Sequence, residues 1–145
     1  MSQAPLVGKR MLIFPDGLVG YPEWRRFTLE GAPDGSPVAW LQGMDDEGAS
    51  FLVTEPRLVC PTFTIEVPAH VRAALGLAPT QEPRTLCMLV IKPEPLTITA
   101  NLLGPIVYNP DSGVACQMVL AESNYSARHP VVVTELDSGQ GGGAC

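Results

Sequence analysis

Short apolar segments separated by turns run along almost the whole chain. In residues 60–66, for example, Phe63 and Ile65 alternate with Thr62 and Thr64, which is typical of a strand with one buried face. The first ten residues are expected to form a loose lead-in. The pattern after them predicts strands over residues 11–14, 26–30, 38–42, 50–54, 60–66, 86–92, 96–101, 105–109 and 114–120.

One segment, residues 67–77, predicts a helix. Pro68 stands where the first turn of a helix tolerates a missing N–H, and Gly76 stands where helices end in the left-handed conformation. Many short strands with one helix between them indicate a mainly β protein. We expect a single-domain, antiparallel β-barrel-like or sandwich fold with one short helix inserted mid-chain.

The composition supports one globular domain. Fourteen glycines and fifteen prolines are scattered without a period, so they separate many short elements. Apolar residues make up 46% of the chain and charged residues 17%, which argues against disorder. We expect the β domain to span residues 1–137. Residues 138–145 (SGQGGGAC) are expected to form a flexible tail outside the fold.

The charge balance limits the class of partner. The net charge is −6, from nine basic and fifteen acidic residues, and the isoelectric point is near 4.7. Nucleic acids are bound by clusters of Lys and Arg that neutralise phosphates, so direct nucleic-acid binding is not expected. An acidic domain is attracted to basic partners instead. The sequence therefore favours a basic protein as a binding partner.

The cysteines and the hydropathy pattern suggest a cytoplasmic protein. Four cysteines occur at positions 60, 87, 116 and 145, without C-x-x-C pairs, so neither disulfides nor zinc are expected. Cys87 and Cys116 lie within apolar segments and are expected to act as small hydrophobic side chains. The pattern of a secretory signal is absent and no apolar run approaches 18 residues, so we expect no membrane span.

Residues typical of catalysis do not occur in any recognisable arrangement. His70 and His129 have no metal ligands at suitable spacing, and the sequence contains neither a phosphate-binding loop nor a nucleophile elbow. The chain is therefore expected to be neither an enzyme nor a cofactor-binding protein.

Several polar and aromatic residues remain candidates for binding. The acidic run Asp45-Asp46-Glu47 is either a solvated turn or a contact patch for a basic partner. The segment from Tyr125 to Pro130 is either pinned to the β domain or an interaction site, since Tyr and Arg dominate interface hot spots. Asn101 and Asn109 are expected to close turns through bonds between side chain and backbone, and the aromatic pair Tyr21 and Trp24 to cap the core or to contact a partner.

Six segments resemble, in the same order, motifs of the flagellar assembly factor FliW family. Residues 14–20 (FPDGLVG) are similar to the opening F-P-x-G-L-x-G, and residues 125–130 (YSARHP) to the ending Y-S-x-R-H-P. Residues 99–110 (TANLLGPIVYNP) resemble T-A-N-L-L-A-P-I-V-x-N-P, with Gly104 in place of the usual Ala. The other matches are residues 27–29, residues 38–42, and Asp45-Asp46 followed by residues 51–56.

The resemblance implies a cytoplasmic, non-enzymatic regulator with a compact β-barrel-like domain. Members of this family bind two protein partners in alternation, flagellin and the small basic RNA-binding repressor CsrA (carbon storage regulator). Holding the repressor prevents it from silencing flagellin mRNA. The charge-based candidates for the repressor are Asp45, Asp46 and Glu47. The motif-based candidates, with no partner assigned, are Asn101, Tyr125, Arg128 and His129.

Two alternative functions remain open from the sequence. One is a flagellin-specific chaperone with no role in translation. The other is a β barrel that encloses a small ligand, which would need a deep pocket with polar groups near Tyr125, Arg128 and His129.

Overall fold

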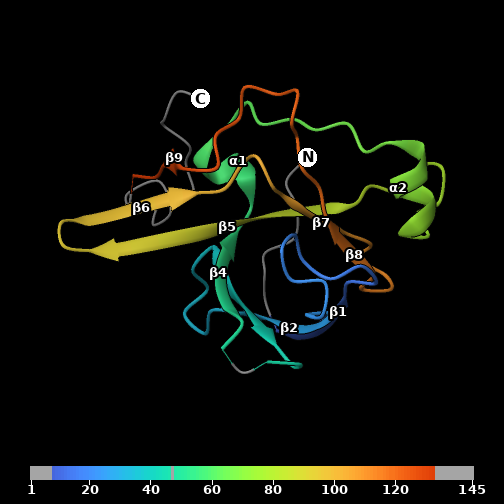
Figure 1. Ribbon diagram of the computed structural model, residues 1–145, viewed down its shortest axis with the longest axis horizontal. Coiled ribbons are helices and arrows are strands. Elements are labelled where there is room, and N and C mark those ends of the chain that lie inside the picture. The colour runs from blue at the N-terminus through green and yellow to red at the C-terminus, as the bar shows by residue number, and fades with distance from the viewer. Residues whose placement is uncertain (1–7, 47, 133–145) are drawn as a thin grey trace.

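The computed structural model of the chain describes residues 8–46 and 48–132, which form a curled antiparallel sheet with two short helices. Strands β1 to β6 and β9 are hydrogen-bonded neighbours in that order, while β7 pairs with β5 and β8 with β7 (Figure 1). The strands are β1 (Lys9–Ile13), β2 (Arg26–Gly31), β3 (Val38–Gly43), β4 (Ser50–Thr54), β5 (Arg84–Pro93), β6 (Leu96–Ala100), β7 (Ile106–Tyr108), β8 (Ala115–Gln117) and β9 (His129–Pro130).

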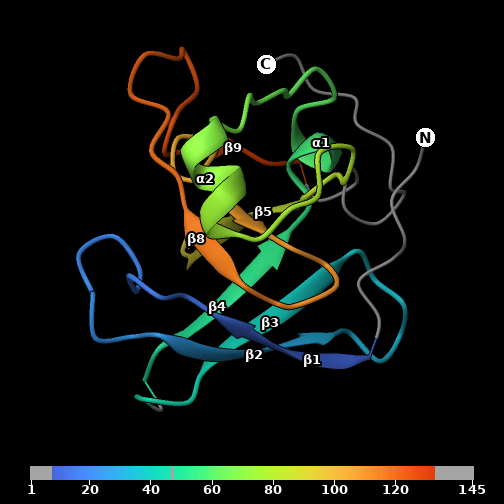
Figure 2. The same cartoon turned by 90° about the vertical axis from the view of Figure 1, so that its right-hand side faces the viewer.

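Strand β5 is ten residues long and joins two parts of the sheet. Its first three residues pair with β7, residues 87–89 pair with β4, and residues 89–93 pair with β6. The sheet therefore turns along β5 and forms a half-barrel. Figure 2 shows the strands β1 to β4 below, with β8 and α2 (Ala69–Ala74) above them.

Apolar side chains cover both faces of the central strands. Because neighbouring residues of a strand point to opposite faces, Leu86 belongs to one core and Cys87 to the other. The first core includes Leu12, Phe14, Phe27, Leu41, Val53, Leu86, Ile106 and Tyr108. The second core consists of Val59, Cys60, Phe63, Cys87, Leu89, Ala100 and Leu102.

The structure confirms the predicted fold class, a mainly β antiparallel domain. The strands expected at residues 26–30, 38–42, 50–54, 86–92 and 96–101 are all present. Those expected at residues 105–109 and 114–120 are shortened to three residues each. β1 begins at Lys9, two residues earlier than expected, so part of the supposed lead-in is a strand. The expected tail lies outside the described residues.

The strand expected over residues 60–66 is wrong. This segment pairs with no strand among the described residues, and the amide of Phe63 bonds to the carbonyl of Cys60 at 2.8 Å. Phe63 is nevertheless buried in the second core. The alternation arises because an irregular covering segment buries one side, which gives the same pattern as a half-buried strand.

The helices also differ from the expectation. The helix predicted over residues 67–77 is shorter, α2, and the left-handed glycine after it, Gly76, is confirmed at φ +68°. A second helix, α1 (Pro56–Val59), was not predicted. Four residues make a single turn, which is too short to show a helical period in the sequence.

The cysteines are only partly as expected. Cys60 is disulfide-bonded, so the expectation that the chain has no disulfide is wrong at this position. Cys87 and Cys116 are free thiols. Cys87 is fully buried, and burial raises its pKa to about 12, as expected for a thiol that acts as an apolar side chain.

Asn109 ties the end of α2 to the turn between β7 and β8. Its amide nitrogen donates to the carbonyls of Leu75 at 2.9 Å and Gly76 at 3.3 Å, and its side-chain oxygen accepts from the amide of Asp111 at 2.9 Å and from Gln81 at 3.1 Å. The side chain is 4% exposed. The predicted turn-closing role of Asn109 is confirmed, and its contacts extend to the two residues that follow α2, 34 and 33 positions away in the sequence.

We expect Asn109→Ala to lower the free energy of unfolding by about 1–3 kcal/mol, because it leaves buried backbone groups without partners. The matched control is Asn124→Ala, at an exposed position. The measurement is urea unfolding followed by tryptophan fluorescence. Equal midpoints for the two variants would contradict the structural role of Asn109.

Candidate partner-binding site

The residues predicted from the sequence lie at two separate parts of the fold. Asp45 and Asp46 follow β3 in the turn to β4, at the bottom of Figure 1. Glu47 lies outside the described residues. The other four lie in or close to the ends of β6 and β9, two strands in the upper left of the same view: Asn101, Tyr125, Arg128 and His129. The structure therefore does not bring the charge-based and the motif-based candidates together.

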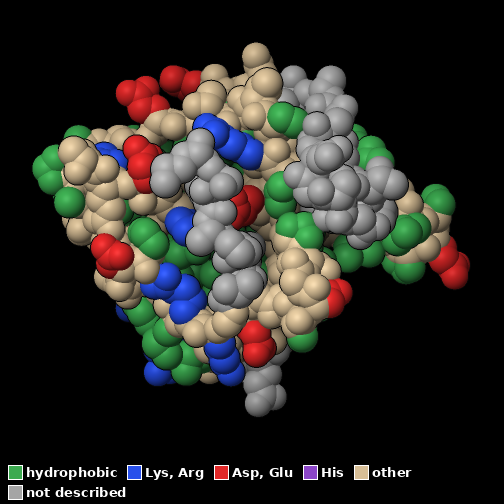
Figure 3. Space-filling model, turned by 180° about the vertical axis from the view of Figure 1, so that it is seen from behind, with side chains coloured by type: hydrophobic (Ala, Val, Ile, Leu, Met, Phe, Trp, Pro, Cys, Tyr) green, Lys and Arg blue, Asp and Glu red, His purple; other side chains and the backbone are tan. Residues whose placement is uncertain are grey.

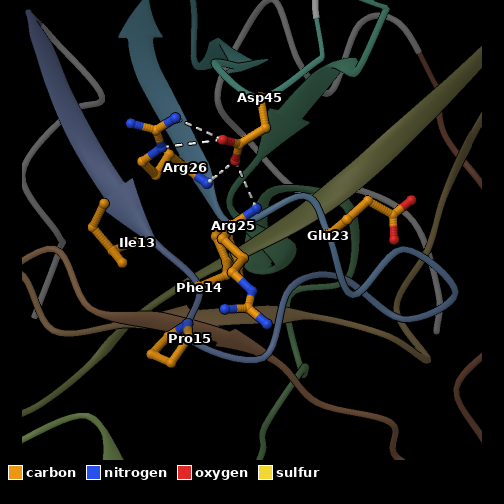
Figure 4. A pocket seen from close by; sticks show the side chains of 7 residues that line it. All are labelled: Ile13, Phe14, Pro15, Glu23, Arg25, Arg26 and Asp45. Carbon is orange, nitrogen blue, oxygen red and sulfur yellow. Dashed lines mark hydrogen bonds and ion pairs between the residues drawn. The ribbon is translucent and has the colours of Figure 1, made fainter.

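Asp45 is fully engaged by the start of β2, in an arrangement that we call the Asp45 clamp. One carboxylate oxygen accepts the backbone N–H groups of Arg25 at 3.0 Å and Arg26 at 2.9 Å. The other accepts Nε of Arg26 at 3.1 Å and a terminal nitrogen of the same guanidinium at 2.8 Å (Figure 4). These bonds from Arg26 and the two backbone groups lower the pKa of Asp45 to about 2.

Asp46 is the part of the acidic turn that remains at the surface. Its Oδ1 accepts the backbone N–H of Gly48 at 2.8 Å, and the residue is exposed. Among the described residues of the turn, Asp46 presents its charge to solvent, whereas the charge of Asp45 is paired with Arg26. A contact between this turn and a basic partner stays a prediction, with Asp46 as its most accessible described carboxylate.

Asn101 closes the turn after β6, as predicted. Its side-chain oxygen accepts the backbone N–H groups of Leu103 at 3.1 Å and Gly104 at 2.9 Å. The carbonyl of Gly104 in turn accepts Gln117 Nε2 at 3.0 Å, while Gln117 Oε1 accepts the backbone N–H of Val19 at 3.0 Å. Two of the motifs singled out in the sequence, at residues 14–20 and 99–110, are therefore connected through one glutamine.

Tyr125 and His129 hold the segment that covers the second core. The hydroxyl of Tyr125 donates to the carbonyl of Thr64 at 3.2 Å and accepts its N–H at 2.9 Å, and its ring lies 4.7 Å from that of Phe63. His129 Nε2 is 3.0 Å from the carbonyl oxygen of Val59. Both side chains are half-buried. Their contacts fit the interpretation that residues 125–130 are pinned to the β domain.

Arg128 differs from its two neighbours because it is exposed. Its backbone N–H donates to Ser126 Oγ at 2.9 Å, which fixes the local turn. The segment 125–130 thus combines two anchoring side chains with one arginine that faces solvent. A role of this segment in partner binding stays a prediction and rests on Arg128 rather than on Tyr125 or His129.

The loop before β2 carries an aromatic pair. The rings of Tyr21 and Trp24 are stacked, with centroids 3.9 Å apart and an angle of 5° between their planes. Trp24 packs against the first core, whereas Tyr21 is 46% exposed. The expected cap of the core is confirmed for Trp24, and Tyr21 extends it to the surface.

A pocket that sequence reasoning missed lies beside the Asp45 clamp. It has a volume of about 460 Å³, and we call it the Arg25 pocket. Its lining, seen in Figure 4, consists of Ile13, Phe14, Pro15, Glu23, Arg25, Arg26 and Asp45. The signal in the sequence was the pair Arg25-Arg26, two adjacent cations in an acidic chain.

Charges and exposed apolar side chains are mixed on the surface. Figure 3 shows arginine and lysine side chains near acidic ones on one face of the molecule. The projecting β5–β6 hairpin exposes Val90, Ile91 and Leu96. Within residues 8–46 and 48–132, no group of three or more His, Cys, Asp or Glu side chains could hold a metal ion. No helix of that part is long and apolar enough to cross a membrane.

The lowered pKa of Asp45 predicts a pH-dependent contribution to stability. Since the folded-state pKa of about 2 lies below the ordinary aspartate pKa of 3.8, the ionised carboxylate stabilises the fold above about pH 4. This contribution is lost as the pH falls toward 2. We expect Asp45→Asn to lower the melting temperature at neutral pH, and the difference from the unmodified protein to shrink on acidification.

The control for this prediction is Asp46→Asn, which removes a neighbouring exposed carboxylate. Both variants and the parent are melted across the pH range by circular dichroism. A loss of stability for Asp45→Asn that is independent of pH, or as small as that of Asp46→Asn, would contradict the clamp.

Comparison with known proteins places these features in a family. The family model described as FliW protein matches residues 3–131 of the chain. The flagellar assembly factor FliW of Geotalea uraniireducens is 34% identical over 125 residues, which are 86% of this chain and 76% of that protein. The corresponding protein of Bdellovibrio bacteriovorus is 32% identical over 130 residues, which are 90% of this chain and 74% of the other.

A solved structure agrees with these sequence matches. The crystal structure of a flagellar assembly factor FliW superposes with a TM-score of 0.75 and 26% sequence identity, and the match covers 83% of this chain and 84% of the other. The predicted resemblance is confirmed over nearly the whole described part of the chain. With its half-barrel, its two covered faces and its ordered motifs, the chain belongs to the FliW family of flagellar assembly factors.

Proposed function

We propose that this chain is a cytoplasmic regulator of flagellar assembly that binds flagellin and, in alternation, the translational repressor CsrA. When the repressor is held by this protein, it does not silence flagellin mRNA, so the repression of flagellin translation is relieved. The observation that carries the proposal is the family match, which extends over residues 3–131 and is accompanied by the same fold.

The charge of the chain supports a basic partner. With a net charge of −6, the domain attracts a small basic protein over distances comparable to the Debye length, about 8 Å at physiological salt. Asp46 presents a carboxylate at the surface of the turn between β3 and β4. We therefore assign the repressor to the side of the molecule that carries this turn.

The interior supports a protein-binding role over the enclosed-ligand alternative. The inner face of the curled sheet is filled by the side chains of the first core, including Phe14, Phe27 and Tyr108, each at most 1% exposed. Tyr125 and His129, which would have lined a ligand site, bond to the backbone of Thr64 and of Val59 instead. Binding by the outer surface is therefore the better supported function.

The experiment is a pull-down with the tagged protein from lysate of its source organism, at low and at high salt. We expect recovery of flagellin at both and recovery of the basic repressor only at low salt, because charge attraction is screened. Asp46→Lys should weaken recovery of the repressor and leave that of flagellin unchanged. The matched control is Glu66→Lys, an equal charge change at an exposed residue of the covering segment.

Recovery of flagellin alone at low salt would contradict the regulatory role and favour the flagellin chaperone. Recovery of neither protein by a folded sample would contradict both. Equal effects of Asp46→Lys and Glu66→Lys would show that net charge, rather than the turn after β3, determines binding of the repressor.

A further inference from the structure

The Arg25 pocket contains an arginine whose backbone is held on both sides. The N–H of Arg25 donates to Asp45 at 3.0 Å, and its carbonyl accepts the N–H of Phe14 at 2.7 Å. Both partners line the same pocket. The base of the Arg25 side chain is therefore fixed by the fold before any ligand arrives, which lowers the entropy cost of binding.

The guanidinium of Arg25 is also oriented, and one edge of it stays open. Its Nε donates to the carbonyl of Pro22 at 3.2 Å. Among the described residues, its two terminal nitrogens have no hydrogen-bond or ion-pair partner. These two nitrogens form the edge of a guanidinium that can bind both oxygens of one carboxylate.

The acidic residues that line the pocket do not neutralise Arg25. The carboxylate of Asp45 is paired with Arg26. Figure 4 shows the side chain of Glu23 running away from Arg25, and no ion pair joins the two within the described residues. Arg25 is thus the cation of this pocket that is available to a ligand.

The rest of the lining suits an apolar group next to the charge. Ile13 and Pro15 form the accessible apolar part of the pocket, since Phe14, which also lines it, is fully buried in the first core. Phe14 lies directly opposite Arg25, as the backbone bond between them shows. A ligand that places an apolar side chain on Ile13 and Pro15 can therefore bring a carboxylate to Arg25 within the same short stretch of chain.

The backbone of the pocket distinguishes between two sources of a peptide carboxylate. Chain-terminal carboxylates are captured by clusters of unused backbone N–H groups. Here the N–H groups of Ile13, Phe14, Arg25 and Arg26 already have acceptors, which are Gly113, Arg25 and, for the last two, Asp45. The pocket offers a side-chain guanidinium instead, which fits the carboxylate of an aspartate or glutamate.

We propose that the Arg25 pocket binds an acidic side chain of a partner polypeptide, with a neighbouring apolar side chain packed on Ile13 and Pro15. This inference goes beyond the proposed function, since it concerns the chemistry of one pocket and does not depend on which protein supplies the acidic segment. The pocket provides one binding site for an acidic side chain on a protein whose net negative charge attracts basic partners.

The test is a titration of the full chain with short blocked peptides, followed by NMR. The probe is acetyl-Leu-Glu-amide at physiological salt, and its neutral counterpart of the same shape is acetyl-Leu-Gln-amide. We expect the glutamate peptide to shift the Nε–H signal of Arg25 and the backbone amide of Phe14. The glutamine peptide should bind at least about tenfold more weakly, because it loses a charge-assisted bidentate bond.

Two variants locate the effect. Arg25→Gln should weaken the glutamate peptide at least about tenfold, and Arg25→Lys should recover only part of the loss, because lysine keeps the charge without the planar fork. Lys92→Gln, which removes an exposed cation on the β5–β6 hairpin outside the pocket, should leave the titration unchanged. Because the side chain of Arg25 is exposed, these variants are expected to fold, and melting curves check this.

Several results would overturn the proposal. It fails if the two peptides shift the same signals with equal affinity, or if the glutamate peptide produces no shift at all. It also fails if Arg25→Gln and Lys92→Gln behave alike while both remain folded. Tighter binding of acetyl-Gln-Leu with a free carboxyl end would overturn the choice of an internal acidic residue.

Discussion

The fold depends on the burial of both faces of its central strands. β5 places Leu86 in the first core and its neighbours Cys87 and Leu89 in the second, so the sheet must be covered on each side. The half-barrel encloses the first core within its own curvature. The second core needs a separate cover, which the chain supplies from the segment around Phe63 and from the returning strand β9. Tyr125 and His129, two of the positions that stand out in the sequence, hold this second cover in place.

The need to cover the second core separates residues that anchor the fold from residues whose side chains face solvent. Tyr125 bonds to the backbone of Thr64 and His129 to that of Val59, whereas Arg128, which lies between them in the sequence, faces solvent. The Asp45 clamp makes a similar division at the other end of the molecule. The charges of Asp45 and Arg26 are paired with each other, and Asp45 also holds the backbone of Arg25. The neighbouring charged side chains of Asp46 and Arg25 remain exposed. Each end of the domain thus has a hydrogen-bonded pair next to an exposed charged side chain, which is compatible with the proposed binding role.

The sequence predicted the elements whose side chains alternate over several residues, and it missed those defined by distant partners. The strands at residues 26–30 and 38–42 bury every second residue and were found with correct bounds to within one residue. The strand β9 has two residues and exists only through pairing with β6, so no local pattern marks it. The role of Asp45 depends on contacts 19 and 20 residues away, and the Arg25 pocket joins three separate segments. Family motifs identified the class of protein correctly but did not distinguish residues that hold the fold from residues that face a partner.

The proposed alternation of partners is tested most directly by competition between them. A fluorescently labelled repressor is bound to the purified chain at low salt, and flagellin is then titrated while the anisotropy of the label is followed. Alternate binding predicts that flagellin releases the repressor in proportion to the complex that it forms. A stable complex of all three proteins, with the anisotropy unchanged or raised at saturating flagellin, would contradict the proposed mechanism.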